Sequence, residues 1–367
     1  MLQIDRIYEI FAKLIYIDFM VISLPNGVPD EHKSDVSWGD FTVLGDERGK
    51  RSALFFYDQE PLIDGMFDKY AKVVSSSEST EWSKEHLWAK DIILVTSEKS
   101  NKVNDFVSSA PKRFIRNLNH STLYYFFHGF ASLDWFRAYH ALNHNKKVVR
   151  DYKFDYQSFN RIVTGARAYR KTFVDQLRSD DLLKHGAVSY GVTDDPVTEE
   201  RLVIDQKQLP GSASADIPDV DAFWHVVTET VFYYDKLHLT EKIFKPIVSK
   251  QPFMLLAAPG NLEYLRSYGF KTFEGIIDES YDSIKDNDAR INAVVSQLKW
   301  YCDLSDDEKT EIQRKCEPIV EHNFQHFYGK FREIITDELL DNTKKLFDEI
   351  GYDDSEIDYD SVRQLLT

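Results

Sequence analysis

One stretch of the sequence, residues 222–260, constrains the fold more than any other. It contains, in order, an apolar run starting at Ala222, a polar loop, a short helical pattern starting near Thr240, a second apolar run and a Pro-Gly turn. Thr240 can cap that helix by accepting a hydrogen bond from a backbone N–H. Phe244 and Ile247 would then share one face, as a helix that packs on a sheet requires. The stretch therefore predicts a strand, a helix and a second strand of an α/β sheet.

The rest of the chain repeats this alternation of strands and helices. The predicted strands are residues 15–24, 35–44, 52–57, 91–96, 122–127, 156–161, 187–191, 222–230, 252–257 and 271–273. The predicted helices are residues 4–14, 131–140, 168–177, 288–302 and 305–328, with a further helix to about residue 350 and then a solvated acidic tail. Such alternation is typical of parallel α/β sheets. We predict two facing Rossmann-like domains, residues 1–150 and 151–330, followed by a C-terminal helix and acidic tail, residues 331–367.

Composition narrows the class of protein. The 367 residues suffice for two domains, and apolar residues make up 43% of them. The formal charge of −16 argues against a general nucleic-acid-binding surface, although a local basic groove stays open. Cys302 and Cys316 offer neither a disulfide framework nor zinc-ligand spacing, so we expect buried free thiols and a reducing compartment. The first apolar run is too short to cross a bilayer and no signal peptide is visible, which predicts a cytoplasmic protein without a membrane span.

Three arginines gather where a predicted strand runs into a helix. The pattern is Asn160-Arg161-x5-Arg167-x2-Arg170, which is dense in cations for an acidic chain. The guanidinium fork suits bidentate phosphate binding. A solvated basic face explains the same pattern equally well.

Polar residues also follow strands of the first half. Asp58, Glu60 and His128 come at such ends, where an open α/β sheet forms its ligand crevice. A carboxylate there could accept a proton from an attacking hydroxyl, although such residues more often cap the next turn. The Glu241-Lys242 pair at the predicted helix N-terminus suits an anion or a ribose phosphate, whereas spacing alone favours an ordinary loop with a solvated ion pair.

Several established motifs are missing. The sequence has no G-x-G-x-x-G after its first strand, no G-x-x-x-x-G-K-[ST], no H-E-x-x-H and no G-x-S-x-G. Asp-x-Asp occurs three times, but never after a convincing strand, so a metal-dependent sugar-transfer site is not supported.

The sequence contains, in order, the segments Val226-Val227-Thr228-Glu229-Thr230, Leu239-Thr240-Glu241-Lys242-Ile243 and Pro252-Phe253. This order resembles the donor-binding signature of family 10 glycosyltransferases, the α-1,3/1,4-fucosyltransferases. The segment from Asn160 to Arg170 is similar to that family's other donor-site block. The resemblance covers about residues 155–275, and the first 150 residues match only in outline. Thr230 stands where the family has Asn, and His238 where it has Tyr, which leaves the donor sugar and nucleotide open.

The resemblance implies a GT-B fold and a donor site without an obligatory metal. Glu241 would hold the ribose and Lys242 a phosphate oxygen. Arg167 would bind the diphosphate, with Arg170 and Arg161 as competitors. Side-chain cations and helix N-termini would then take up the charge of the leaving nucleoside diphosphate. Asn160, Glu229, Thr230, His238 and Thr240 complete the predicted donor site.

The same resemblance implies that Glu60, or else Asp58, is the catalytic base. We therefore expect a glycosyltransferase that uses a nucleoside-diphosphate sugar, such as a GDP- or UDP-sugar, as its co-substrate and that needs no other cofactor. Transfer to an acceptor hydroxyl, with inversion, would give a glycoside. A glycan is the expected acceptor, and a lipid-linked sugar or, in a phage-borne enzyme, a hydroxymethylated DNA base are alternatives. A non-catalytic nucleotide- or glycan-binding module and a structural assembly protein are hypotheses of other classes.

Overall fold

The structure is a computed structural model of the whole chain. It describes residues 91–101, 103, 119–191, 217, 220–233, 236–351, 354–355 and 357–366, together with the strands within 20–24, 41–45, 52–56, 203–204 and 207–208. The chain divides into two compact units, one formed by residues 1–130 and 333–367 and the other by residues 131–332. The first unit thus ends earlier than the boundary predicted near residue 150, and it includes the C-terminal segment.

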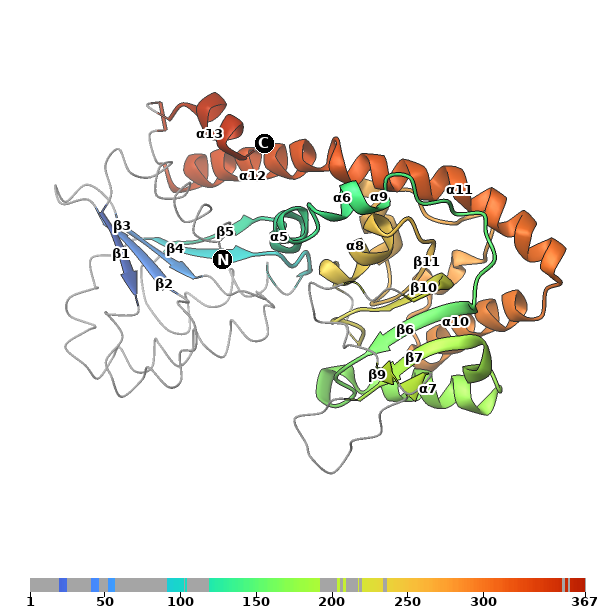
Figure 1. Cartoon of the computed structure of the whole chain (residues 1–367). Coiled ribbons are helices and arrows are strands. Elements are labelled where there is room, and N and C mark those ends of the chain that lie inside the picture. The colour runs from blue at the N-terminus through green and yellow to red at the C-terminus, as the bar shows by residue number, and fades with distance from the viewer. Residues whose placement is uncertain are drawn as a thin grey trace. The chain divides into compact units, whose positions relative to one another are not determined.

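The first unit contains a five-stranded sheet whose strands follow one another in chain order (Figure 1). The strands are β1 (Met20–Leu24), β2 (Phe41–Gly45), β3 (Ser52–Phe56), β4 (Asp91–Thr96) and β5 (Asn119–Tyr124). β1, β2 and β3 pair antiparallel, whereas β3, β4 and β5 pair parallel. The sheet is therefore mixed, with its parallel half on the β4–β5 side.

Helix α5 (Phe127–Trp135) follows β5 after two residues. The strand predicted at residues 122–127 is therefore displaced toward the N-terminus, and His128 is in the first turn of a helix instead of at a strand end. His128 is also buried, at 3% exposure. The aromatic run Tyr124–Phe127 has strong strand propensity, but the strand ends at Tyr124 and the helix already begins at Phe127.

The second unit contains a four-stranded sheet in which every pairing is parallel. Its strands are β6 (Phe154–Asn160), β7 (Gly186–Tyr190), β10 (Ala222–Thr228) and β11 (Phe253–Leu256), in the spatial order β11-β10-β6-β7. The chain passes from β6 to β7 on one side and then returns to place β10 on the other side of β6. The strand order therefore reverses between β6 and β10, where an open parallel sheet binds its ligands beyond the carboxyl ends of the strands.

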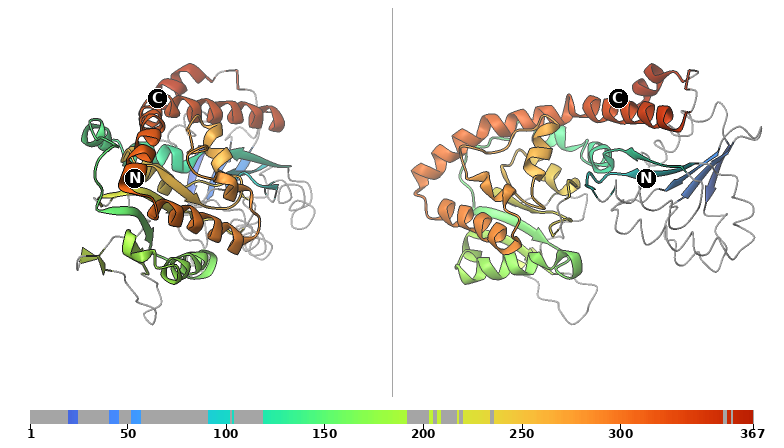
Figure 2. Two further views of the ribbon diagram at one scale, coloured as in Figure 1. Left: turned by 90° about the vertical axis from the view of Figure 1, so that its right-hand side faces the viewer. Right: turned by 180° about the vertical axis from the view of Figure 1, so that it is seen from behind.

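Helices cover both faces of this sheet (Figures 1 and 2). On one face α7 (Tyr169–Ser179) packs against α10 (Asn287–Cys302), and α10 also contacts β6 and β11. On the other face α8 (Glu241–Val248) contacts β10, α6 (Tyr139–Asn143) and α11 (Asp306–Tyr328). This is the layered α/β arrangement predicted from the alternation of strands and helices.

Aromatic side chains fill the core on either side of the sheet. Trp224 of β10 is fully buried, with its ring edge-on to those of Phe273 and Tyr301. Phe244 of α8 packs against Phe327 of α11 and against Phe270 and Phe331. Burial of rings of this size contributes about 1.5–3 kcal/mol each, which fixes α8 and α10 on the sheet.

Local signals in the sequence explain where several helices begin. Thr240 caps α8 by accepting from the backbone N–H of Lys242, as predicted. Ser305 and Glu308 form a reciprocal capping box at the start of α11. These bonds satisfy backbone donors at the helix starts that have no intrahelical partners.

Three elements differ from the sequence predictions. Residues 271–273 are irregular instead of a strand, although Phe273 is buried. The helix α9 (Asn261–Ser267) was not predicted, because Pro259-Gly260 reads as a turn and only seven helical residues follow. After α12 (Phe331–Ile350), which was predicted, the acidic tail includes a further helix, α13 (Tyr359–Leu366), whose Val362 is buried.

The loop predicted at residues 193–218 contains a short antiparallel pair, β8 (Val203–Ile204) and β9 (Lys207–Gln208). Among the helices in the described part of the chain, none is long and apolar enough to cross a membrane.

Candidate functional site

The candidate site lies in the second unit, where β6 and β10 end at the reversal of strand order. Asn160 is the last residue of β6, and Thr228 is the last residue of β10. The hydroxyl of Thr228 donates to Oδ1 of Asn160 over 2.9 Å, which ties the two strand ends together. The amide of Asn160 donates to Ser158 and to the carbonyl of Ser189 on β7. Asn160 is completely buried, and its side chain links the ends of β6, β7 and β10.

Glu229 organises the loop that connects β10 to α8. One carboxylate oxygen accepts from the backbone N–H of Thr230 over 3.0 Å and from the hydroxyl of Thr240 over 2.6 Å. The other oxygen accepts from the backbone N–H of Thr240 over 3.1 Å. Glu229 has no exposed surface. Its carboxylate thus closes the loop on itself and places the first turn of α8 beside the end of β10.

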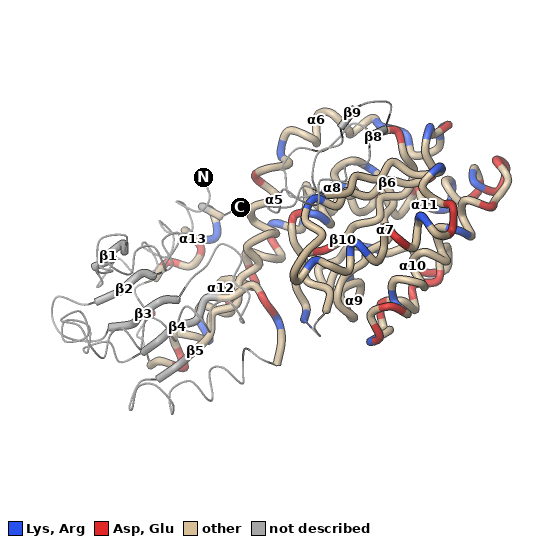
Figure 3. Tube along the Cα trace, turned by 90° about the horizontal axis from the view of Figure 1, so that it is seen from below, with Lys and Arg blue, Asp and Glu red and all other residues tan. Residues whose placement is uncertain are grey.

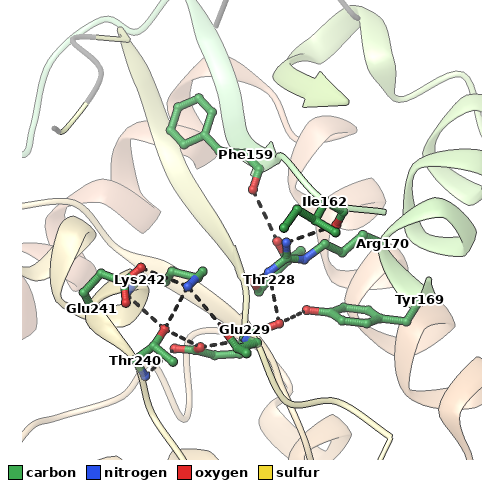
Figure 4. A network of polar contacts seen from close by, with 10 residues as sticks. Phe159, Ile162, Tyr169, Arg170, Thr228, Glu229, Thr240, Glu241 and Lys242 are labelled. Atoms are coloured by element: carbon green, nitrogen blue, oxygen red, sulfur yellow. Dashed lines mark hydrogen bonds and ion pairs between the residues drawn. The ribbon is translucent and has the colours of Figure 1, made fainter. Parts of the chain in front are cut away.

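The first turn of α8 presents Glu241 and Lys242 to this cluster (Figure 4). The ammonium group of Lys242 donates to Oγ1 of Thr230 and Oγ1 of Thr240, each over 3.2 Å, and to a carboxylate oxygen of Glu241 over 2.9 Å. Glu241 and Lys242 are 5% and 6% exposed. A buried ion pair at a helix N-terminus is a site where an anion could replace the carboxylate of Glu241 as the partner of Lys242.

Arg170 has a different position from the one expected of a diphosphate ligand. It is 1% exposed, and its terminal nitrogens donate to the backbone carbonyls of Thr228 over 2.7 Å and of Ile162 and Glu229 over 3.2 Å. Figure 4 shows this guanidinium group on the backbone of the strand end. Because those donors hold main-chain oxygens, Arg170 stabilises the end of β10 and the loop after β6 instead of facing a ligand.

Tyr169 reinforces the same point of the backbone. Its hydroxyl donates to the carbonyl of Glu229, and its ring stacks on that of Phe232 with centroids 4.0 Å apart. Burial raises the pKa of Tyr169 to about 12, with Arg170 acting in the opposite direction. The hydroxyl therefore stays protonated and able to donate at neutral pH.

Arg161 and Arg167 lie in the loop between β6 and α7. Arg161 directly follows Asn160 and is exposed, and Arg167 ends the short helix η2 (Gly165–Arg167) and is half-buried. Gly165 has a φ of +58°, a conformation that other residues adopt at a cost. Of the three predicted phosphate arginines, these two are the ones whose side chains have access to solvent.

His238 lies inside the same loop as Glu229 and Thr240. It is 1% exposed, and its backbone N–H donates to Oδ1 of Asn261 over 3.0 Å. Asn261 also donates to the carbonyls of Lys236 and Ala258. The side-chain amide of Asn261 therefore holds the loop between β10 and α8 against the end of β11.

The structure brings together a polar network whose predicted members are Asn160, Arg170, Glu229, Thr230, Thr240, Glu241 and Lys242, and His238 lies in the same loop. Other members were not identified by sequence analysis. Those it missed are Ser158, Tyr169, Ser189, Thr228 and Asn261. Tyr169 stands next to a predicted arginine, and Thr228 next to a predicted glutamate, so proximity to Arg170 and Glu229 was a usable signal. Ser158, Ser189 and Asn261 gave none, because their roles depend on which strands lie next to each other.

The predicted catalytic residues, Asp58 and Glu60, lie outside the described residues. Within the described part of the first unit, a cavity of about 490 Å³ opens beyond the carboxyl ends of β4 and β5. Its lining includes Glu98, Tyr124 and, from α12, Glu338 and Asn342. Lys99, which also lines it, forms an ion pair with Glu338 at 2.6 Å. Hydroxyl, amide and carboxylate groups therefore dominate this cavity.

Charge of both signs is spread over the outer helices of the second unit. Acidic and basic residues both occur along α10 and α11 (Figure 3). Such a mixture does not create the concentrated positive potential that binding of a nucleic-acid phosphate backbone requires.

No family model, no curated protein and no solved structure matches this chain. The similarity to family 10 glycosyltransferases therefore stays a prediction that depends on the residues quoted for it. The function has to be inferred from the arrangement of the site's own side chains.

Proposed function

We propose that the protein is a glycosyltransferase of GT-B architecture that uses a nucleoside-diphosphate sugar, inverts the anomeric centre and needs no metal in its donor site. One observation carries the proposal: Asn160, Glu229 and the first turn of α8 converge at the strand-order reversal of a parallel sheet. Parallel sheets bind nucleotides at that position, where helix N-termini and loop residues meet.

The donor's diphosphate would bind between α8 and the loop after β6. Lys242 would exchange its bond to Glu241 for a phosphate oxygen, while its bonds to Thr230 and Thr240 keep the ammonium group in place. Glu241, released from that pair, would accept hydrogen bonds from the ribose hydroxyls. This exchange preserves the pairing of the buried ammonium group, which would otherwise cost several kcal/mol.

Arg167, with Arg161 as the second candidate, would approach the diphosphate from the opposite loop. Both side chains have access to solvent, and a guanidinium group can bind two phosphate oxygens at once. Charge that develops on the leaving nucleoside diphosphate would thus be taken up by Lys242, an arginine and the N-terminus of α8. Glu60, or else Asp58, would deprotonate the acceptor hydroxyl as it attacks the anomeric carbon.

The acceptor that we favour is a glycan. The polar cavity beyond β4 and β5 suits a hydroxyl-rich molecule, since its lining offers both donors and acceptors. A hydroxymethylated base in DNA is less compatible with the net charge of −16 and with the mixed charge of α10 and α11.

A thermal-shift screen against GDP-, UDP-, ADP- and CMP-sugars tests donor binding. A donor at a concentration about 100 times its Kd should stabilise the protein by about 2.7 kcal/mol. The Arg167→Met variant should lose most of this shift, whereas Arg178→Met, on the exposed side of α7 and paired with Asp175, should keep it. A full shift in Arg167→Met and in Arg161→Met would contradict the proposed diphosphate site.

A transfer assay with the donor found in the screen then separates an enzyme from a binding module. Glu60→Gln should abolish transfer and donor hydrolysis while leaving the thermal shift intact. Donor binding without turnover in the wild-type protein, with any of a panel of glycan acceptors, would favour the non-catalytic module. The absence of any nucleotide-dependent shift would favour a structural protein.

A further inference from the structure

A second group of chemically active side chains lies at the opposite edge of the same sheet. Asp155 is the second residue of β6, and His185 immediately precedes β7. Cys302 is the last residue of α10. One ligand atom from each of the three, a carboxylate oxygen, an imidazole nitrogen and the sulfur, lies within 4.8 Å of the others. Cys302 is more than a hundred positions away from both Asp155 and His185 in the sequence, and the fold places all three around one point.

The backbone holds these residues firmly in place. β6 and β7 pair in register from Tyr156 and Gly186 onward, which fixes Asp155 and His185 side by side. A Cβ on Gly186 would lie 2.3 Å from the ring of Tyr156, so only glycine permits this close approach. The hydroxyl of Tyr156 donates to the carbonyl of Leu182 in the turn that leads to His185. The group is therefore set by the core of the unit and not by mobile surface side chains.

The two oxygens of Asp155 have separate partners. Oδ2 lies 3.2 Å from Nδ1 of His185, whereas Oδ1 lies 2.8 Å from the ammonium group of Lys309. Lys309 thereby fixes the orientation of the carboxylate from behind, as partners of metal-binding carboxylates commonly do. Oδ2 stays directed toward His185 and Cys302.

We propose that Asp155, His185 and Cys302 form a zinc site, with a water molecule as the fourth ligand. Carboxylate, imidazole and thiolate are the ligand types that zinc takes in proteins. Zinc–ligand bonds of about 2.0–2.3 Å in a tetrahedron put neighbouring ligand atoms roughly 3.3–3.8 Å apart. The observed separations, from 3.2 Å to at most 4.8 Å, reach that arrangement by small side-chain rotations.

This site would not take part in the proposed sugar transfer. It lies at the amino ends of β6 and β7, whereas Asn160 and Thr228 mark the carboxyl edge of the sheet. Zinc would tie the end of α10 to the two strands. Cys302 would bind as the thiolate and release its proton to solvent, so no oxidant or reductant is involved. An ion pair between Asp155 and Lys309 that needs no metal is the competing explanation.

Metal titration of the full chain separates the two explanations. Co²⁺ reports directly on the ligands, because thiolate coordination gives an intense near-ultraviolet charge-transfer band and tetrahedral geometry gives strong visible bands. We expect one equivalent of Co²⁺ to produce both, and Zn²⁺ to displace it. Zn²⁺ at about 100 times its Kd should also raise the Tm by roughly 5–10 °C.

The two cysteines supply a matched control. Cys302→Ser should abolish the charge-transfer band and the zinc-dependent rise in Tm, and His185→Ala should weaken zinc binding by more than about 100-fold. Cys316, which is also buried but lies on α11 and outside the group, can be replaced by Ser without loss of either signal. The metal-free Tm of each variant shows that it folds. The proposal is overturned if the wild-type protein gives no charge-transfer band, or if Cys302→Ser binds zinc as tightly as Cys316→Ser.

Discussion

Replacing Arg170 with methionine should destabilise the protein strongly, even though sequence analysis placed this arginine among the phosphate ligands. Its guanidinium group is buried and donates to the carbonyls of Ile162, Thr228 and Glu229. Methionine fills much of the same volume but donates no hydrogen bond. The change therefore isolates the polar contribution of Arg170 from its contribution to packing.

The magnitude follows from these three contacts. A hydrogen bond from a charged donor contributes about 1.5–3 kcal/mol, and a buried carbonyl left without a partner costs about 1–3 kcal/mol. The carbonyl of Glu229 keeps the hydroxyl of Tyr169, so the carbonyls of Thr228 and Ile162 carry most of the loss. Removing the buried guanidinium group also removes its own desolvation cost, which offsets part of the sum. We expect a decrease of about 3–5 kcal/mol in the free energy of unfolding.

Urea denaturation, followed by far-ultraviolet circular dichroism, measures this difference. Arg178→Met is the matched control, since Arg178 lies on the same helix but pairs with Asp175 at the surface and should contribute about 0–1 kcal/mol. Arg170→Lys, which keeps the charge but not the fork, should fall between the two. If Arg170→Met unfolds at the same urea concentration as Arg178→Met, the structural role assigned to Arg170 is wrong and a role in ligand binding returns.

Three further changes test the fold around the site. Burial, and after it the charge of Lys245, lowers the pKa of His225 to about 3. The free energy of unfolding should therefore be highest above about pH 6.5 and should fall by roughly 1.4 kcal/mol per pH unit toward pH 3. Acid denaturation of His225→Gln should lack this decrease, and an unchanged curve would contradict the prediction. Gly186→Ala should cost about 1–3 kcal/mol in thermal unfolding because the new methyl group meets the ring of Tyr156. Ser305→Ala should cost about 0.5–2 kcal/mol through loss of the helix cap, and no change in Tm would show that the cap contributes nothing.

Much of the second unit could be predicted because its signals are local. Strands β10 and β11 are short, largely apolar runs, and the buried residues of helices α7, α10 and α11 have regular helical spacing. Thr240 and Ser305 mark helix starts through bonds to residues two or three positions away. Where packing overrides such signals the predictions failed, as at residues 271–273, whose aromatic side chain fills the core without joining the sheet.

The site was predictable in membership but not in the role of each residue. A motif shows that Arg161, Arg167 and Arg170 share one junction, but the direction of each side chain depends on helical phase and on what lies beneath. α7 turns Arg170 toward the carbonyls at the end of β10, and Arg161 precedes the helix and stays exposed. The Asp155–His185–Cys302 group could not be found from spacing, because a strand, a turn and a distant helix end supply one residue each.

The charges of the candidate site impose a limit on how it can be tested. Two buried carboxylates, Glu229 and Glu241, lie among the cations Lys242 and Arg170, so the described network is balanced by its own members. Removing Glu241 or Lys242 takes away the ion-pair partner of the other buried charge, and removing Glu229 or Arg170 takes away the hydrogen bonds of buried backbone groups. Either loss costs several kcal/mol whether or not a ligand ever binds there. Loss of donor binding in such a variant would therefore report on folding. Arg161 and Arg167, which have access to solvent, are the positions where a loss of binding at unchanged Tm can be assigned to the ligand itself.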